Sequence, residues 1–302
     1  ANTAVGYQAA MSLTTGTDST AIGMGALFTE DVGNRSVAIG TQSLYSQNTA
    51  SAGNANNVAV GVFAGYHNVT GINNTKVGVS AGQGVSTKSH SGCVFIGTNA
   101  GYTAYTGDNN IAIGYGAMDD VDADDTVGAS TENVFIGKDA GGGTWVTAAS
   151  SYNVGIGNLV MDAAMNGALS NTAVGHASLG GLIEGDYNSV LGKEAGYAIE
   201  DGDYNTCVGT EAGTVIVDGN QNTIIGATSQ PSANSGANQT VVGYATTAVA
   251  DNSVTLGNAD VTATYLASGA SDANILYIGD TANAGMTVGV TINQGAADNE
   301  IL

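Results

Sequence analysis

The sequence predicts an all-β fold, a parallel β-solenoid in which short strands stack coil upon coil. The pentad Asn110–Gly114 (NIAIG) recurs with small changes along almost the whole chain, and fifteen copies end in glycine. The residue before each glycine is Val, Ile or Leu. The commonest step between these glycines is about 17 residues, as from Gly6 to Gly23, and a fixed period indicates a repeat architecture, because one unit cannot bury its apolar side without its neighbours.

The terminal glycines define the repeats. The shortest step between them runs from Gly243 to Gly257, and the longest from Gly114 to Gly137. Independent hairpins would not need a constant period, so we favour a solenoid of about fifteen coils. The anchoring glycines are Gly6, Gly23, Gly40, Gly61, Gly78, Gly97, Gly114, Gly137, Gly157, Gly175, Gly192, Gly209, Gly226, Gly243 and Gly257.

Each pentad is predicted to be a short strand between two turns. β-Branched residues favour extended backbone, whereas the flanking Asn and Gly tolerate left-handed conformations. Ile111 and Ile113 share one face of the strand, and Ala112 lies on the other. We expect the Val and Ile columns to fill the interior and the Ala column to face outward. The rest of each coil is long enough that we expect it to hold a second strand as well.

A second column of small residues follows each pentad, as in Ala64–Tyr66 and Ala195–Tyr197. Small side chains allow two backbones to approach closely. This column is compatible with contact inside the coil or with contact to a partner subunit.

The composition limits the partners of the chain. Its 302 residues carry a formal net charge of −21, which disfavours nucleic acids and anionic membrane surfaces. No run of about 18 apolar residues is present, so no membrane insertion is predicted. An acidic surface suits an extracellular protein in a salty medium, where screening relieves self-repulsion. Cys93 and Cys207 lie six coils apart, roughly 29 Å at the spacing of strands, which is too far for a disulfide.

The pattern divides the chain into two parts. Residues 1–257 hold the repeats. Residues 258–302 depart from the period and contain longer apolar alternations, among them Val261–Leu266 and Met286–Ile292. We expect this second part to be a β-rich neck or cap, and the chain to be a segment of a longer protein.

Four coils exceed the common period by about two residues or more. Their excess falls in residues 48–56, 84–92, 119–131 and 141–152. Loops on a rigid scaffold often carry recognition. We therefore expect these segments to decorate the outside of the rod and to form one binding patch.

Two of these segments contain candidate site residues. Asp120, Asp122 and Asp124 alternate as the first ligands of a calcium loop do, but Asp125 stands where that loop requires Gly and Thr131 where it requires Glu. A looser calcium site and a solvated acidic loop both stay open.

Trp145 is the single Trp of the chain and lies in a Gly-rich segment. An exposed ring there would stack on a sugar or an apolar receptor patch, and Tyr152 would join it. The alternative is that Trp145 folds back over the rod.

Nothing in the sequence predicts an enzyme. His67, His90 and His176 lie on different coils, and no Cys stands at ligand spacing. No nucleophile–base pair has a supporting arrangement. We expect no catalytic residues and no cofactor, apart from the calcium hypothesis.

The pentads also resemble a known family. Ser36–Gly40 (SVAIG) and Asn252–Gly257 (NSVTLG) closely resemble the head repeats of YadA-like trimeric autotransporter adhesins. This resemblance implies a left-handed β-roll and a homotrimer with three rolls side by side. The period of this chain is longer than that of the adhesin heads. The form Asn2–Ala9 (NTAVGYQA) looks more like the variant found in phage tail fibre proteins.

The resemblance implies a non-enzymatic fibrous attachment protein. The first reading is a segment of a phage tail fibre or virion appendage whose partner is a host-cell surface receptor, either glycan or protein. One alternative is the head of a bacterial cell-surface adhesin. Another is a structural subunit of a self-assembling extracellular filament. No binding residue of the family transfers to this chain.

Overall fold

The computed structural model describes residues 1–49, 53–86, 88–103, 107–120, 129–145 and 148–262. Ala1–Asp260 form one compact unit. The expected neck or cap in residues 258–302 lies almost entirely outside the described residues.

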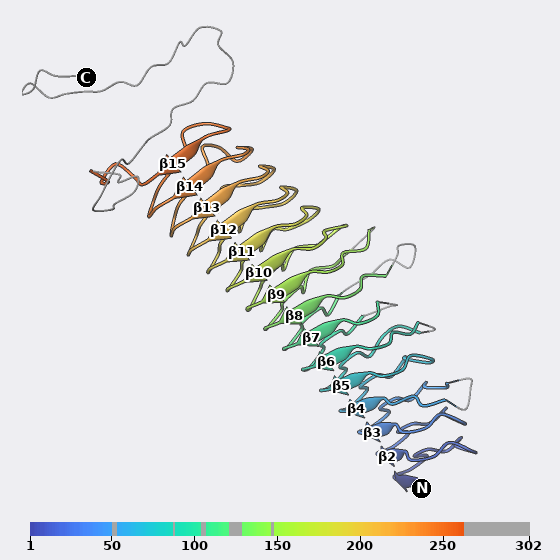
Figure 1. Ribbon diagram of the computed structural model, residues 1–302. Coiled ribbons are helices and arrows are strands. Elements are labelled where there is room, and N and C mark those ends of the chain that lie inside the picture. Colours follow the sequence, from blue (N-terminus) through green and yellow to red (C-terminus); the bar gives the residue numbers. More distant parts are fainter. Residues whose placement is uncertain (50–52, 87, 104–106, 121–128, 146–147, 263–302) are drawn as a thin grey trace, which may run out of the picture. The chain divides into compact units, whose positions relative to one another are not determined.

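The unit is a stack of coils joined by one parallel sheet (Figure 1). The order of strands in the sheet is their order in the chain, and neighbours pair without a register shift. Ile111, for example, lies opposite Val134, and Ile113 opposite Ile136. The prediction of an all-β parallel solenoid is confirmed. The fifteen strands are β1 Thr3–Val5, β2 Thr20–Ile22, β3 Val37–Ile39, β4 Val58–Val60, β5 Thr75–Val77, β6 Val94–Ile96, β7 Ile111–Ile113, β8 Val134–Ile136, β9 Val154–Ile156, β10 Thr172–Val174, β11 Ser189–Leu191, β12 Thr206–Val208, β13 Thr223–Ile225, β14 Thr240–Val242 and β15 Val254–Leu256.

The other half of each coil is a series of turns, so the expectation of two strands per coil is wrong. In the described part of the chain this half shows only isolated bridges, such as Gln230 with Thr247. Leu27 and Leu44 have φ angles of 51° and 47° there, which bend the backbone too sharply for a strand. Hydrogen bonds still join successive coils, since the Leu27 amide donates to the carbonyl of Ser43 at 2.9 Å.

The register predicted for the strands is also wrong. From β2 to β14, the middle residue is buried and both its neighbours face outward. In β7 the side chain of Ala112 is fully buried, whereas Ile111 and Ile113 are partly exposed. The small residues therefore line the interior, and the Val and Ile columns lie on the surface.

The reason is the narrow interior of the coil. The middle strand residue and the residue four positions after the glycine both point inward, and their sizes compensate. Ala38 is matched by Leu44, both fully buried in one cluster. Phe95 is matched by Gly101, where an added Cβ would lie 2.8 Å from the Phe95 ring. Where these two columns meet, most coils thus hold one large side chain, close-packed against its neighbours.

A second interior feature is a line of buried amides, which we call the amide ladder. Asn188 is typical. Its Nδ2 donates to Asn171 Oδ1 at 3.0 Å and to the Gly202 carbonyl at 2.7 Å, and its Oδ1 accepts from the amide of Asn205 at 2.9 Å. The ladder satisfies the backbone at one corner of each coil, as buried polar groups require. Its members each precede a strand: Asn57, Asn74, Asn110, Asn133, Asn153, Asn171, Asn188, Asn205 and Asn222.

Cys93 interrupts this ladder between Asn74 and Asn110. Its amide donates to Asn74 Oδ1 at 2.9 Å, and its Sγ lies 3.3 Å from the carbonyl of Gly107. Burial raises the pKa of this thiol to about 11. Cys93 and Cys207 are both buried free thiols.

The pentad glycines are required by the stacking itself. Gly61 has a φ angle of 142°, and a Cβ on it would lie 2.2 Å from the carbonyl oxygen of Gly78 in the next coil. A side chain at this corner would push successive coils apart, because no other residue accepts this conformation and this contact. This explains why all fifteen repeats keep the glycine.

Candidate functional site

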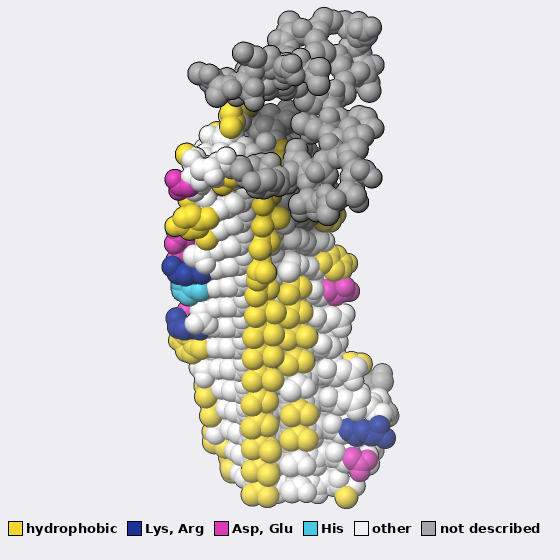
Figure 2. All heavy atoms as spheres, turned by 60° about the vertical axis from the view of Figure 1, so that its left-hand side comes forward, with side chains coloured by type: hydrophobic (Ala, Val, Ile, Leu, Met, Phe, Trp, Pro, Cys, Tyr) yellow, Lys and Arg dark blue, Asp and Glu magenta, His cyan; other side chains and the backbone are white. Residues whose placement is uncertain are grey.

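The outward side chains before the pentad glycines form one apolar row along the sheet. Figure 2 shows it as a continuous column of hydrophobic side chains. Many of its members are substantially exposed, Leu191 by 52%. We call it the apolar row, and its members are Val5, Ile22, Ile39, Val60, Val77, Ile96, Ile113, Ile136, Ile156, Val174, Leu191, Val208, Ile225, Val242 and Leu256.

The other outward column of the same strands is mixed. Thr or Ser occupies it in β1, β2, β5 and β10–β14, so the apolar surface is narrow there. Figure 2 shows the matching short apolar segments beside the continuous column. The apolar members widen the row in the middle of the sheet: Val37, Val58, Val94, Ile111, Val134 and Val154.

The apolar row exposes more apolar area than the largest patch of a typical monomer. If each of its fifteen side chains leaves about 70 Å² in solvent, the row exposes on the order of 1,000 Å², against about 300–600 Å² for the largest patch of a typical monomer. A specific interface buries roughly 800 Å² on each partner. The row is therefore the candidate functional surface of this chain, and its chemistry is that of an assembly interface.

Trp145 is not exposed, so the expectation of an outward stacking ring is wrong. Its side chain is 1% exposed and belongs to the main core cluster. The indole packs edge-on against Phe135, with 5.7 Å between ring centroids. The coil that carries the Gly-rich segment turns this ring inward, where it fills space beside Phe135. The structure agrees instead with the alternative expectation, in which Trp145 folds back over the rod.

Tyr152 lies on the outside, away from Trp145. It has a φ angle of 63° in the turn just before the buried Asn153. Tyr187 and Tyr204 occupy the same position of later coils, and their exposed rings stack at 5.0 Å. The two residues expected to share one patch are thus separated, one in the core and one at an outer corner.

Asp120 ties neighbouring coils together. Its carboxylate accepts hydrogen bonds from the hydroxyl of Thr103 at 3.4 Å and from the hydroxyl of Thr144. Asp122 and Asp124 lie outside the described residues. Among the residues that the structure does describe, no group of three or more His, Cys, Asp or Glu is placed to hold a metal ion. The calcium hypothesis stays a prediction.

Two carboxyl groups near Asp120 have raised pKa values. Burial, and then the carboxylates of Asp139, Asp120 and Asp162, raise the pKa of Asp119 to about 6. Burial, and then the charge of Asp139, also raises the pKa of Asp162. These groups follow one another on successive coils, so like charges accumulate along this side of the rod.

The longer coils remain only partly described. Residues 48–56, 84–92, 119–131 and 141–152 each include positions outside the described ranges. The single binding patch expected from them stays a prediction, without Trp145 as a member.

No family model matches the chain, and no curated protein matches it significantly. In the described ranges, no helix is long and apolar enough to cross a membrane.

Proposed function

We propose that this chain is a rod-shaped segment of an extracellular attachment fibre, most simply a phage tail fibre or virion appendage that contacts a host cell. Three copies pack side by side through their apolar rows. The observation that carries this proposal is the continuous row itself. The role is structural and adhesive, without catalysis.

The argument for assembly is energetic. Burying about 1,000 Å² of apolar surface per chain at about 25 cal/mol per Å² contributes on the order of 25 kcal/mol before the entropic costs of association. Left in water, the same surface promotes aggregation. The row is straight and spans all fifteen strands, so it fits another straight rod better than a compact partner. The number three comes from the resemblance to adhesin heads.

The charge of the chain supports an extracellular site of action. A net charge of −21 opposes the approach of two rods, and the apolar row contains no charged residue. Salt in the surrounding medium limits the range of this repulsion to about 10 Å. Association is therefore favoured on one face and opposed on the others.

The assembly is tested by the mass in solution. Three chains of 29.7 kDa give a particle of about 90 kDa. The variant Ile225→Asp places a charge in the row and should yield folded monomers. Val215→Asp is the matched control, because Val215 is 44% exposed against 41% for Ile225 and lies off the row. A wild-type monomer, or equal effects of the two variants, would refute the interface.

Attachment is tested separately with fluorescent protein and a panel of bacterial and animal cells. Saturable binding to particular bacteria supports the host-contact role. Binding to animal cells or matrix proteins instead favours the cell-surface adhesin. End-to-end polymers that bind no cell favour the structural filament. The complete reading frame distinguishes a tail-attachment module from a membrane barrel.

A further inference from the structure

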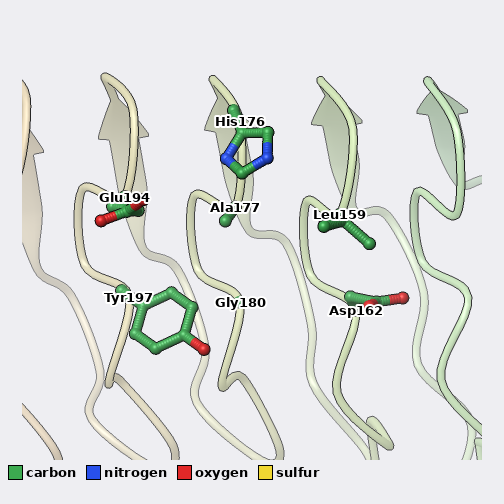
Figure 3. Close-up of a pocket in the computed structure, with 7 residues that line it drawn as sticks. All are labelled: Leu159, Asp162, His176, Ala177, Gly180, Glu194 and Tyr197. Atoms are coloured by element: carbon green, nitrogen blue, oxygen red, sulfur yellow. The ribbon is translucent and has the colours of Figure 1, made fainter.

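A groove crosses the coils that carry β9, β10 and β11. Its volume is about 420 Å³. Figure 3 shows how side chains from three successive coils surround it. The residues that matter are Leu159, Asp162, His176, Gly180, Glu194 and Tyr197.

The groove exists because one coil lacks a side chain. In three successive coils near the N-terminus, the position five residues after the pentad glycine carries a ring that stacks on its neighbours. Phe28, Tyr45 and Tyr66 stack in this way, with centroids 4.8 and 5.1 Å apart. Gly180 occupies this position in its coil. Gly180 therefore leaves room between Asp162 and Tyr197, which occupy this position in the coils before and after it.

Tyr197 lies across this gap. A Cβ on Gly180 would lie 2.8 Å from Cε2 of the Tyr197 ring, so the ring rests on the glycine. The Tyr197 side chain is nevertheless 51% exposed. Figure 3 shows the ring leaning over the coil of Gly180, with His176 at one end of the groove. One face of the ring is held by the protein, and the other is available to a ligand.

The polar groups around the ring are hydrogen-bonding groups without a strong net charge. Glu194 Oε1 accepts from Lys193 Nζ at 2.9 Å, so its charge is partly compensated. Asp162 lies on the far side of Gly180 and leans towards the coil of Gly142 (Figure 3). His176 adds an imidazole that both donates and accepts.

We propose that this groove binds a neutral pyranose unit of a surface polysaccharide. The apolar face of the sugar stacks on Tyr197, and its hydroxyl groups form hydrogen bonds with Glu194 and His176. This inference rests on the proposed attachment function and gives it a ligand and a place. The aromatic ring that contacts the sugar is then Tyr197, which is exposed, and not Trp145, which is buried.

The surroundings select against charged ligands. An anionic sugar would meet the carboxylates of Asp162 and Glu194 and the acidic surface of the whole rod. A cationic ligand would compete with Lys193 for Glu194. A neutral sugar needs only the flat ring and the hydrogen-bond acceptors. The groove is open and crosses several coils, which suits an internal unit of a long chain.

The test measures binding to a printed array of oligosaccharides. Neutral glycans are compared with sialylated and phosphorylated glycans, which are anionic, and with choline-coated spots, which are cationic. Labelled wild-type protein should bind neutral glycans at least fivefold above the other classes. Tyr197→Ala should reduce this signal at least fivefold, whereas Tyr197→Phe should keep it. Gly180→Ala should also reduce it, because the new methyl group lifts the ring. The backbone of Gly180 is not in the left-handed region, so its conformation accepts alanine.

Tyr102→Ala is the matched control, because Tyr102 occupies the same position of another coil with Gln83 rather than glycine beside it. This control should keep wild-type binding. The proposal is overturned if no neutral glycan binds, if charged spots bind better, or if Tyr102→Ala loses as much as Tyr197→Ala. Cell attachment by Tyr197→Ala separates the two proposals. If the variant attaches normally, the groove is not the adhesive site although the attachment function stands.

Discussion

Replacing Lys76 by methionine should stabilise the rod in a pH-dependent way. Lys76 is the middle residue of β5 and is fully buried between Ala59 and Phe95. Gly65 and Gly82 make room for its side chain. Within the described part of the chain, its Nζ has no hydrogen-bond partner. A cation without a partner in such a site is costly, because nothing replaces its hydration.

The size of the expected stabilisation follows from the pKa of Lys76. Burial lowers the pKa of Lys76 from 10.5 to about 7, and the nearby Cys93 opposes this shift weakly. Each unit of pKa corresponds to about 1.4 kcal/mol, so the cost of burying the lysine approaches roughly 4–5 kcal/mol at and below neutral pH. Between pH 7 and 10.5 the unfolded chain binds a proton that the folded chain lacks. The stability of the wild type should therefore rise with pH across this window.

The assay is guanidinium unfolding of the wild type and Lys76→Met at several pH values from 6 to 10.5. Methionine fills a similar volume without a charge. The variant should be more stable by several kcal/mol at pH 6–7, and the difference should shrink steadily towards pH 10.5. Lys193→Met, at an exposed lysine, should show no such trend. A difference that does not vary with pH, or a less stable variant, would refute the argument.

Three further changes test the interior. Asn188→Ala removes the buried hydrogen bonds of one amide and should cost about 2–4 kcal/mol in urea unfolding. Ala112→Asp buries a charge and should abolish the cooperative thermal transition, whereas Ile113→Asp should keep the circular dichroism spectrum and lower the mass in solution. Trp145→Ala empties core volume and should cost about 3–5 kcal/mol by the same unfolding measurement. Unchanged stability in any buried variant would contradict the assigned packing.

The period of the sequence was enough to predict the solenoid, because a repeat places the same residue type at the same corner of each coil. The register was not predictable from the pentad alone. An alternation of period two assigns Ala112 and Ile113 to opposite faces without stating which face is inside. The larger apolar residues were expected inside because burial usually favours them.

A second column of the sequence indicates which strand residues face the interior. Bulky residues in the middle of a strand coincide with glycine six residues later, as in Phe95 with Gly101 and Phe135 with Gly141. Ala112 coincides instead with Met118. Residues whose sizes compensate must share one enclosed space. This covariation within a single chain identifies the inward column.

The candidate sites were harder to predict because they depend on gaps and directions. Trp145 lies in a Gly-rich segment, and such segments give no sign of which way the ring will turn. The groove at Tyr197 depends on the absence of a side chain at Gly180. A missing side chain becomes visible only after the coils are aligned and their neighbours are known.

The interrupted amide ladder has a mechanical consequence. The hydrogen bonds between coils run along the rod, so a fibre pulled from its ends loads every coil boundary in series. The weakest boundary then determines the rupture force. Within the ladder, the boundary between β6 and β7 lacks an amide-to-amide link, because Cys93 stands in place of Asn. Between Asn57 and Asn222, we expect a stretched rod to part first at this boundary, and a Cys93→Asn variant to withstand a larger force there.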